Sequence, residues 1–170
     1  MRRSENKGTR VPYFVPGSYY MIEKQTIQAI AEEFIKGTDL FLVAVKVSSA
    51  NRITVLADKK ESITIDECAA LHRHIENSLD REKEDFELQV SSPGLDLPFG
   101  VIEQYYKNED RRIEVVDIDG VKYTGKLKNV TSGGFELEAD VKVKGKAKEI
   151  KDLSFNFEQV KSARVILIIK

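Results

Sequence analysis

The chain has 170 residues, of which 41% are hydrophobic and 32% are charged, and its formal net charge is −1. This composition is typical of a globular protein with room for one medium domain or two small ones. The apolar runs, such as VILII at 165–169, are much shorter than the roughly 20 residues that span a bilayer, so we expect no membrane insertion. A single cysteine, Cys68, excludes an internal disulfide and a cysteine-rich metal site.

The first 20 residues are predicted to lie outside the fold. They are basic but contain no continuous apolar core, because Pro12 and Pro16 interrupt it, so they do not have the pattern of a secretory signal. A second methionine, Met21, stands just before the first periodic segment. We therefore interpret 1–20 as a flexible leader or an upstream-start extension.

The charge is distributed unevenly along the chain. Residues 21–99 contain 9 Lys/Arg against 15 Asp/Glu, a net charge of −6, whereas residues 100–170 contain 14 against 12, a net charge of +2. An acidic first half is not expected to follow a phosphate backbone by its overall charge.

The order helix, strand, strand, helix, strand is predicted for residues 21–99. Apolar residues recur with helical spacing from Ile22 to Ile35, and strands of branched and aromatic residues follow at 40–47 and 52–59 as an antiparallel pair. Thr64 and Glu67 have the spacing of a capping box, which predicts a helix start, and the alternation at 86–90 predicts a third strand. The first domain is therefore expected to be a small α/β unit.

Short strands dominate the prediction for residues 100–170, after a short helix at 101–107. Asp119-Gly120 between two alternating runs predicts a hairpin with a type I′ turn. Further strands are expected at 134–139, 147–155 and 163–170, so that five short strands would form a small closed barrel of the SH3 or Sm kind. The overall fold class is then α+β.

The most unusual stretch is VSSPGLDLPF, residues 90–99, at the end of the third predicted strand. A serine nucleophile would need an adjacent base and an oxyanion hole, and the G-x-S-x-G elbow is absent here. We therefore favour a structured turn that braces the two domains over a serine hydrolase. Its expected members, with hydroxyl and carboxylate groups that accept backbone donors and prolines that restrict the chain, are Ser91, Ser92, Pro93, Gly94, Asp96 and Pro98.

Histidine and cysteine give little support for a metal or catalytic site. His72 and His74 are two residues apart on a predicted helix and would point in nearly opposite directions, so they cannot bind one metal together. His74 is expected to be a solvated surface group, and Cys68 belongs to the apolar side of its helix. We expect no cofactor and no metal.

A basic stripe is predicted in the second half, because lysines at every second position of a strand share one face. The stripe consists of Lys142, Lys144, Lys146 and Lys148. It is interpreted either as a phosphate contact or as a solvated hairpin face. Arg111 and Arg112 either extend this surface or pack between the domains.

The residues named above resemble one known family, the bacterial ribosome maturation factor RimP. VSSPGLDLPF is similar to the family's signature, SITIDECAALHRHIENSLD at 62–80 to its preceding helix, and GTDLFLVAVKV at 37–47 to its first strand. The resemblance implies a KH-like α/β domain at 21–99 joined to an SH3- or Sm-like barrel at 100–170. It also implies a cytoplasmic, non-enzymatic factor that binds the free small ribosomal subunit and assists its maturation.

Two features depart from that family pattern. Leu97 stands where the family usually has a basic residue, and no G-x-x-G loop, which clamps nucleotide backbones in KH modules, occurs in 21–99. The expected partners are rRNA and a basic ribosomal protein, with no small-molecule substrate, and the chain is expected to be a monomer. A general RNA-binding module without a ribosomal role is the alternative.

Overall fold

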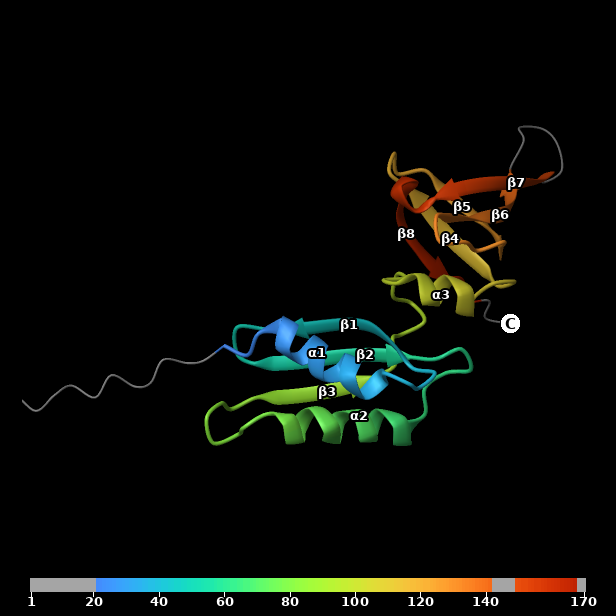
Figure 1. Cartoon of the computed structure of the whole chain (residues 1–170). Helices are drawn as coiled ribbons and strands as arrows, with labels where there is room; N and C mark the ends of the chain where they lie inside the picture. Colours follow the sequence, from blue (N-terminus) through green and yellow to red (C-terminus); the bar gives the residue numbers. More distant parts are fainter. Residues whose placement is uncertain (1–20, 142–148, 168–170) are drawn as a thin grey trace, which may run out of the picture.

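The computed structural model describes residues 21–141 and 149–167, so the leader and the predicted lysine stripe lie outside the described residues. Two bodies of secondary structure follow each other along the chain (Figure 1). The first contains α1 (Lys24–Ile35), β1 (Phe41–Val47), β2 (Arg52–Asp58), α2 (Ile65–Ser78) and β3 (Glu87–Ser91). The second contains α3 (Ile102–Lys107), β4 (Arg112–Asp117), β5 (Lys122–Lys128), β6 (Gly134–Val141), β7 (Glu149–Asn156), η1 (Phe157–Gln159) and β8 (Val160–Val165).

The first sheet has the order β1-β2-β3, with β1 antiparallel and β3 parallel to β2. One face of the sheet is covered by the two helices. Ile27 on α1, Leu71 and Ile75 on α2 and Ile53 and Val55 on β2 lie in one buried cluster. The predicted order of elements and the antiparallel pairing of the first two strands are confirmed.

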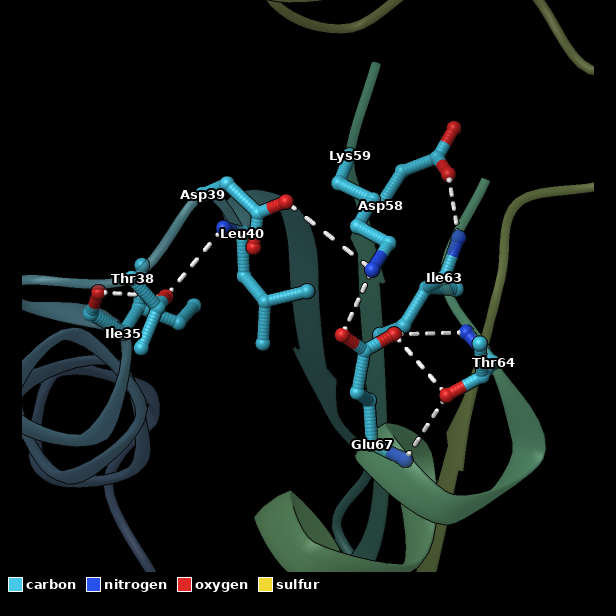
Figure 2. A network of polar contacts seen from close by, with 9 residues as sticks. All are labelled: Ile35, Thr38, Asp39, Leu40, Asp58, Lys59, Ile63, Thr64 and Glu67. Atoms are coloured by element: carbon cyan, nitrogen blue, oxygen red, sulfur yellow. Dashed lines mark hydrogen bonds and ion pairs between the residues drawn. The ribbon is translucent and has the colours of Figure 1, made fainter. Parts of the chain in front are cut away.

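A polar network holds the start of α2 (Figure 2). The Thr64 hydroxyl accepts a hydrogen bond from the Glu67 backbone N–H at 3.2 Å, and the Glu67 carboxylate accepts one from the Thr64 N–H at 2.8 Å. This is the predicted capping box, which satisfies backbone donors at the helix start. The Lys59 ammonium donates to Glu67 at 2.7 Å, and together these hydrogen bonds lower the pKa of Glu67 to about 2.

Glu67→Gln should therefore make the protein less stable at pH 7 and change its response to acid. Because folding lowers the pKa of Glu67 from 4.5 to about 2, its contribution is complete above about pH 4.5 and is lost as the pH falls toward 2. The melting temperatures of the wild type and Glu67→Gln, followed by circular dichroism, should differ at pH 7 and converge near pH 2. Glu33→Gln, at an exposed position on α1, is the control, and an equal difference at both pH values would contradict the assignment.

The second sheet has the order β7-β6-β5-β4-β8, and all of its strand pairs are antiparallel. Ile113, Val115, Leu127 and Leu137 are fully buried in its core. The expected closed barrel is not found, because no ladder among the described residues joins β7 to β8. The chain turns through η1 after Asn156 and returns to pair with β4, which leaves β7 and β8 as the two ends of the sheet.

Two details of the second half differ from the sequence prediction. The hairpin between β4 and β5 is present, but only Gly120 has a positive φ, of 82°, so the type I′ turn is wrong. The Asp117 carboxylate accepts hydrogen bonds from the backbone N–H groups of Asp119 and Val121, which holds the turn without a positive φ at Asp119. The last strand, β8, runs from Val160 to Val165 and does not include 166–167, while 168–170 of the predicted strand 163–170 lie outside the described residues.

Candidate interface between the two sheets

The segment 90–99 runs from the first sheet to the second. Ser91 is the last residue of β3 and lies opposite Leu56 of β2. The chain then turns, with the Leu97 N–H donating to the Gly94 carbonyl at 3.1 Å, and the Phe99 N–H donates to the Ala163 carbonyl of β8 at 2.7 Å. The segment is therefore hydrogen-bonded into both sheets.

The side chains of this segment form few polar contacts. Within the described residues, Ser91, Ser92 and Asp96 form no side-chain hydrogen bond, so the capping of backbone donors by these groups stays a prediction. Gly94 has no positive φ, and a β-carbon there would lie 2.6 Å from Asp96 Oδ1, at the end of a flexible side chain that can turn away, so the geometry does not require glycine at this position.

An ion pair joins the two halves at the same place. The Lys107 ammonium, on α3, donates to Asp58 Oδ2 at 2.6 Å and to the Ser62 hydroxyl at 3.2 Å. The two charged side chains are only 11% and 7% exposed. Asp58 Oδ1 also accepts the Ile63 N–H at 3.3 Å, so both carboxylate oxygens have a partner. A charge pair with this burial and these partners favours one arrangement of the two bodies over others.

Helix α3 lies between the two sheets in Figure 1, and Lys107 is its last residue. The Gln104 side-chain oxygen accepts hydrogen bonds from the Gly100 N–H at 2.6 Å and the Val101 N–H at 3.3 Å. Asn108 is buried and donates through its side chain to the Gln104 carbonyl at 2.7 Å. These bonds satisfy groups at both ends of a helix of six residues and hold it in place.

A cleft of about 260 Å³ lies beside the ion pair. Its lining includes Ser92, Leu95 and Leu97 from the segment 90–99, and Arg111 and Val165 from the second half. Leu95 and Leu97 are 56% and 42% exposed, so this opening presents apolar surface next to charge. Such a surface can bind a macromolecular partner, and Leu97 makes it less basic than the family pattern implies.

The two predicted arginines lie in different surroundings. Arg111 is exposed, lines the cleft and donates to Asn108 Oδ1 at 3.4 Å. Arg112 lies in β4 and forms an ion pair with Asp140 of β6, within the second sheet. Only Arg111 is therefore brought to the junction. Asp58, Ser62 and Lys107 were missed, since residues up to 49 positions apart carry no local motif.

The histidines point apart, as predicted. His72 Nε2 lies 3.2 Å from the Leu88 carbonyl of β3, and the His74 ring packs on Phe34 of α1 with 5.3 Å between centroids. His74 is not the solvated group expected, because it faces α1 and its Nε2 atom is buried. Across residues 21–141 and 149–167, no group of three His, Cys, Asp or Glu side chains is arranged to hold a metal ion.

No helix in the described ranges is long and apolar enough to cross a membrane. The described residues form a mixed α+β protein with two small sheets. The buried ion pair between Lys107 and Asp58 lies at the junction between these sheets.

The family model of the RimP N-terminal domain matches residues 30–96. The ribosome maturation factor RimP of Porphyromonas gingivalis is 36% identical over 148 residues, which cover 84% of this chain and 97% of that protein. The proteins of the same name from Christiangramia forsetii and Chlorobium luteolum are 39% identical over 93 residues and 30% identical over 158 residues. Those matches cover 54% and 81% of this chain and 61% and 90% of the two relatives. The chain belongs to the RimP family of ribosome maturation factors, and the resemblance noted in the sequence is confirmed.

Proposed function

We propose that this protein is a non-catalytic, cytoplasmic assembly factor that binds the free, immature 30S subunit and assists its maturation. Family membership carries the proposal, since the relatives are named as ribosome maturation factors. The junction supports it physically, because a buried ion pair, a bridging segment and an exposed apolar cleft meet at one place. Two bodies held in a defined arrangement can contact two ribosomal components at once.

The two bodies are proposed to be separate domains, a KH-like domain at 21–99 and an SH3- or Sm-like domain at 100–170. Each has its own buried cluster, which supports a boundary near Phe99. In the second sheet the last strand, β8, returns beside the first, β4, and this order supports the SH3 or Sm comparison. Without a G-x-x-G loop, the first domain is proposed to bind by another mode than KH modules.

Charge indicates which partner each domain would take. The first domain, with a net charge of −6, suits a basic ribosomal protein, and the second, with +2, suits rRNA. Arg111 at the cleft and the predicted lysine stripe would contribute to the rRNA contact. No cofactor or small-molecule substrate is part of the proposal, and the chain would act as a monomer.

Sucrose-gradient sedimentation of a cell extract tests this function. The protein should migrate with free small subunits and not with assembled ribosomes. Its absence from every ribosomal fraction, with retained binding to free RNA, would instead establish a general RNA-binding module. Immunoblotting of the gradient fractions shows where the protein migrates, and a separate binding assay with free RNA tests the alternative.

Replacing Lys142, Lys144 and Lys146 by glutamate should weaken association with the small subunit and reduce its salt dependence, if the stripe meets phosphate. The control carries the same charge change on the first domain, at the exposed Lys24, Lys36 and Lys46. Affinity is measured by co-pelleting at several salt concentrations. Equal affinities of the two triple variants would remove the stripe from the proposed contact.

A further inference from the structure

A second cavity, of about 450 Å³, lies within the second half, away from the ion pair. We call it the aromatic pocket, and its defining residues are Phe99, Tyr105, Ser132, Phe157, Lys161 and Ser162. They come from the segment before α3, from α3, from the β5–β6 connection, from η1 and from β8. The pocket is therefore formed by three separate stretches of chain, around 99–105, 132 and 157–162, that the fold brings together.

Aromatic rings form its wall. The rings of Phe99 and Phe157 each meet the ring of Tyr105 edge to face, with centroid distances of 4.8 Å and 5.0 Å. Phe135 supports Tyr105 from behind at 5.2 Å and is 3% exposed. A wall supported by a buried ring keeps its shape when a flat ligand lies against it.

Tyr105 is 7% exposed, but its hydroxyl forms no hydrogen bond within the described residues. Among the described residues, His74 Nε2 is the one fully buried side-chain polar atom that lacks a hydrogen-bond partner. The Tyr105 hydroxyl also lacks a partner, so it is not fully buried. Desolvation raises the pKa of Tyr105 to about 12, as expected of a phenol with restricted access to water. Tyr105 lines the pocket and its hydroxyl keeps some exposure to solvent, so this hydroxyl is available to a polar atom of a ligand.

The remaining polar groups of the pocket are two hydroxyls and one cation. The side chains of Ser132 and Ser162 form no hydrogen bond to the described residues. Lys161 is exposed and has no ion pair there, and it is the one charged residue among those that line the pocket. The pocket thus combines aromatic surface, three hydroxyls and a single positive charge.

We infer that the aromatic pocket binds one unpaired nucleobase of an RNA strand, with Lys161 beside the adjoining phosphate. Bases stack on aromatic side chains, and their edges need hydrogen-bond partners of the kind that hydroxyls supply. A purely apolar peptide side chain would cover the three hydroxyls without giving them partners, which disfavours it. The inference rests on the proposed function, because it makes RNA of the immature subunit the source of the base.

The test uses the full chain and a fluorescein-labelled pentamer of RNA, with binding followed by fluorescence anisotropy. Tyr105→Phe removes only the hydroxyl and should weaken binding about two- to tenfold. Phe157→Leu should weaken it roughly tenfold or more, since stacking is lost. Lys161→Gln should reduce both the affinity and its salt dependence.

Matched controls lie outside the pocket. Tyr106→Phe alters the exposed neighbour of Tyr105, and Lys122→Gln alters an exposed lysine of β5. Both should bind the pentamer as the wild type does. Thermal melting checks that Phe157→Leu folds, and Tyr105→Phe keeps the test decisive if it does not, because that change leaves the ring packing intact.

Two outcomes would overturn the inference. The first is that Tyr105→Phe and Lys161→Gln bind the pentamer with wild-type affinity. The second is that a proline-rich peptide, and not RNA, shifts the aromatic NMR signals of the pocket. The wild-type chain's sedimentation with small subunits is measured in parallel. Sedimentation without pentamer binding would reject the pocket alone, whereas pentamer binding without sedimentation would reject the ribosomal role alone.

Discussion

Lys107→Met should loosen the arrangement of the two sheets while leaving each of them folded. The variant leaves the Asp58 carboxylate, which is 7% exposed, without its cation. A buried charge without a partner is unfavourable, and here it regains water if the two bodies move apart. A charge-assisted hydrogen bond contributes about 1.5–3 kcal/mol, so the ratio of joined to separated forms should fall roughly 10- to 150-fold.

Small-angle X-ray scattering measures this loosening as an increase in the radius of gyration, and NMR relaxation measures it as independent tumbling. Lys151→Met is the matched control, since Lys151 lies 3.9 Å from Glu149 and is 55% exposed. Asp58→Asn combined with Lys107→Met should recover part of the compact form, because no unpaired charge remains. A single variant as compact as the wild type would show that the ion pair does not hold the junction.

Gly134→Ala should lower the free energy of unfolding of the second half by about 3 kcal/mol or more. A β-carbon at Gly134 would overlap the Phe155 carbonyl oxygen, and it would lie 3.0 Å from the Asn156 Cα. These atoms belong to the paired strand β7, so no side-chain rotation can relieve the overlap. Urea unfolding followed by circular dichroism gives the change directly.

The neighbouring glycine provides the control. A β-carbon at Gly133 meets no atom within 4 Å, and Gly133 has no positive φ. Gly133→Ala should therefore leave the stability unchanged or raise it by up to about 1 kcal/mol, because alanine restricts the unfolded chain. Equal losses in the two variants would mean that the loss comes from the turn and not from the strand pairing.

Local patterns predicted much of this fold. The capping box at Thr64 and Glu67, the helix α2 behind it and the hairpin at Gly120 each depend on residues within a few positions of one another. Hydrogen bonds and side-chain periodicity over such short distances depend only on neighbouring residues. The order of the elements in the first half could therefore be predicted from the sequence. The same holds for the RimP resemblance, which rests largely on contiguous motifs in 37–99.

Contacts between residues far apart in the sequence could not be predicted from local patterns. Whether the second sheet closes depends on where β8 finds a partner, and a strand's apolar pattern is the same for every partner. His74 was expected in solvent, but the packing of α1 against α2 places it on Phe34. The position of His74 on α2 determines the direction of its side chain. The packing of α1 determines whether that side chain is buried or exposed to solvent.

The candidate site also contains local features that the sequence predicted and long-range contacts that it did not predict. VSSPGLDLPF identified the segment that links the two sheets, because prolines, glycine and a strand end are visible in ten consecutive residues. Asp58, Ser62 and Lys107, and the rings around Tyr105, come together only when separate elements pack. Their chemistry follows from burial and from distances across the fold, which are physical quantities that no short stretch of sequence contains.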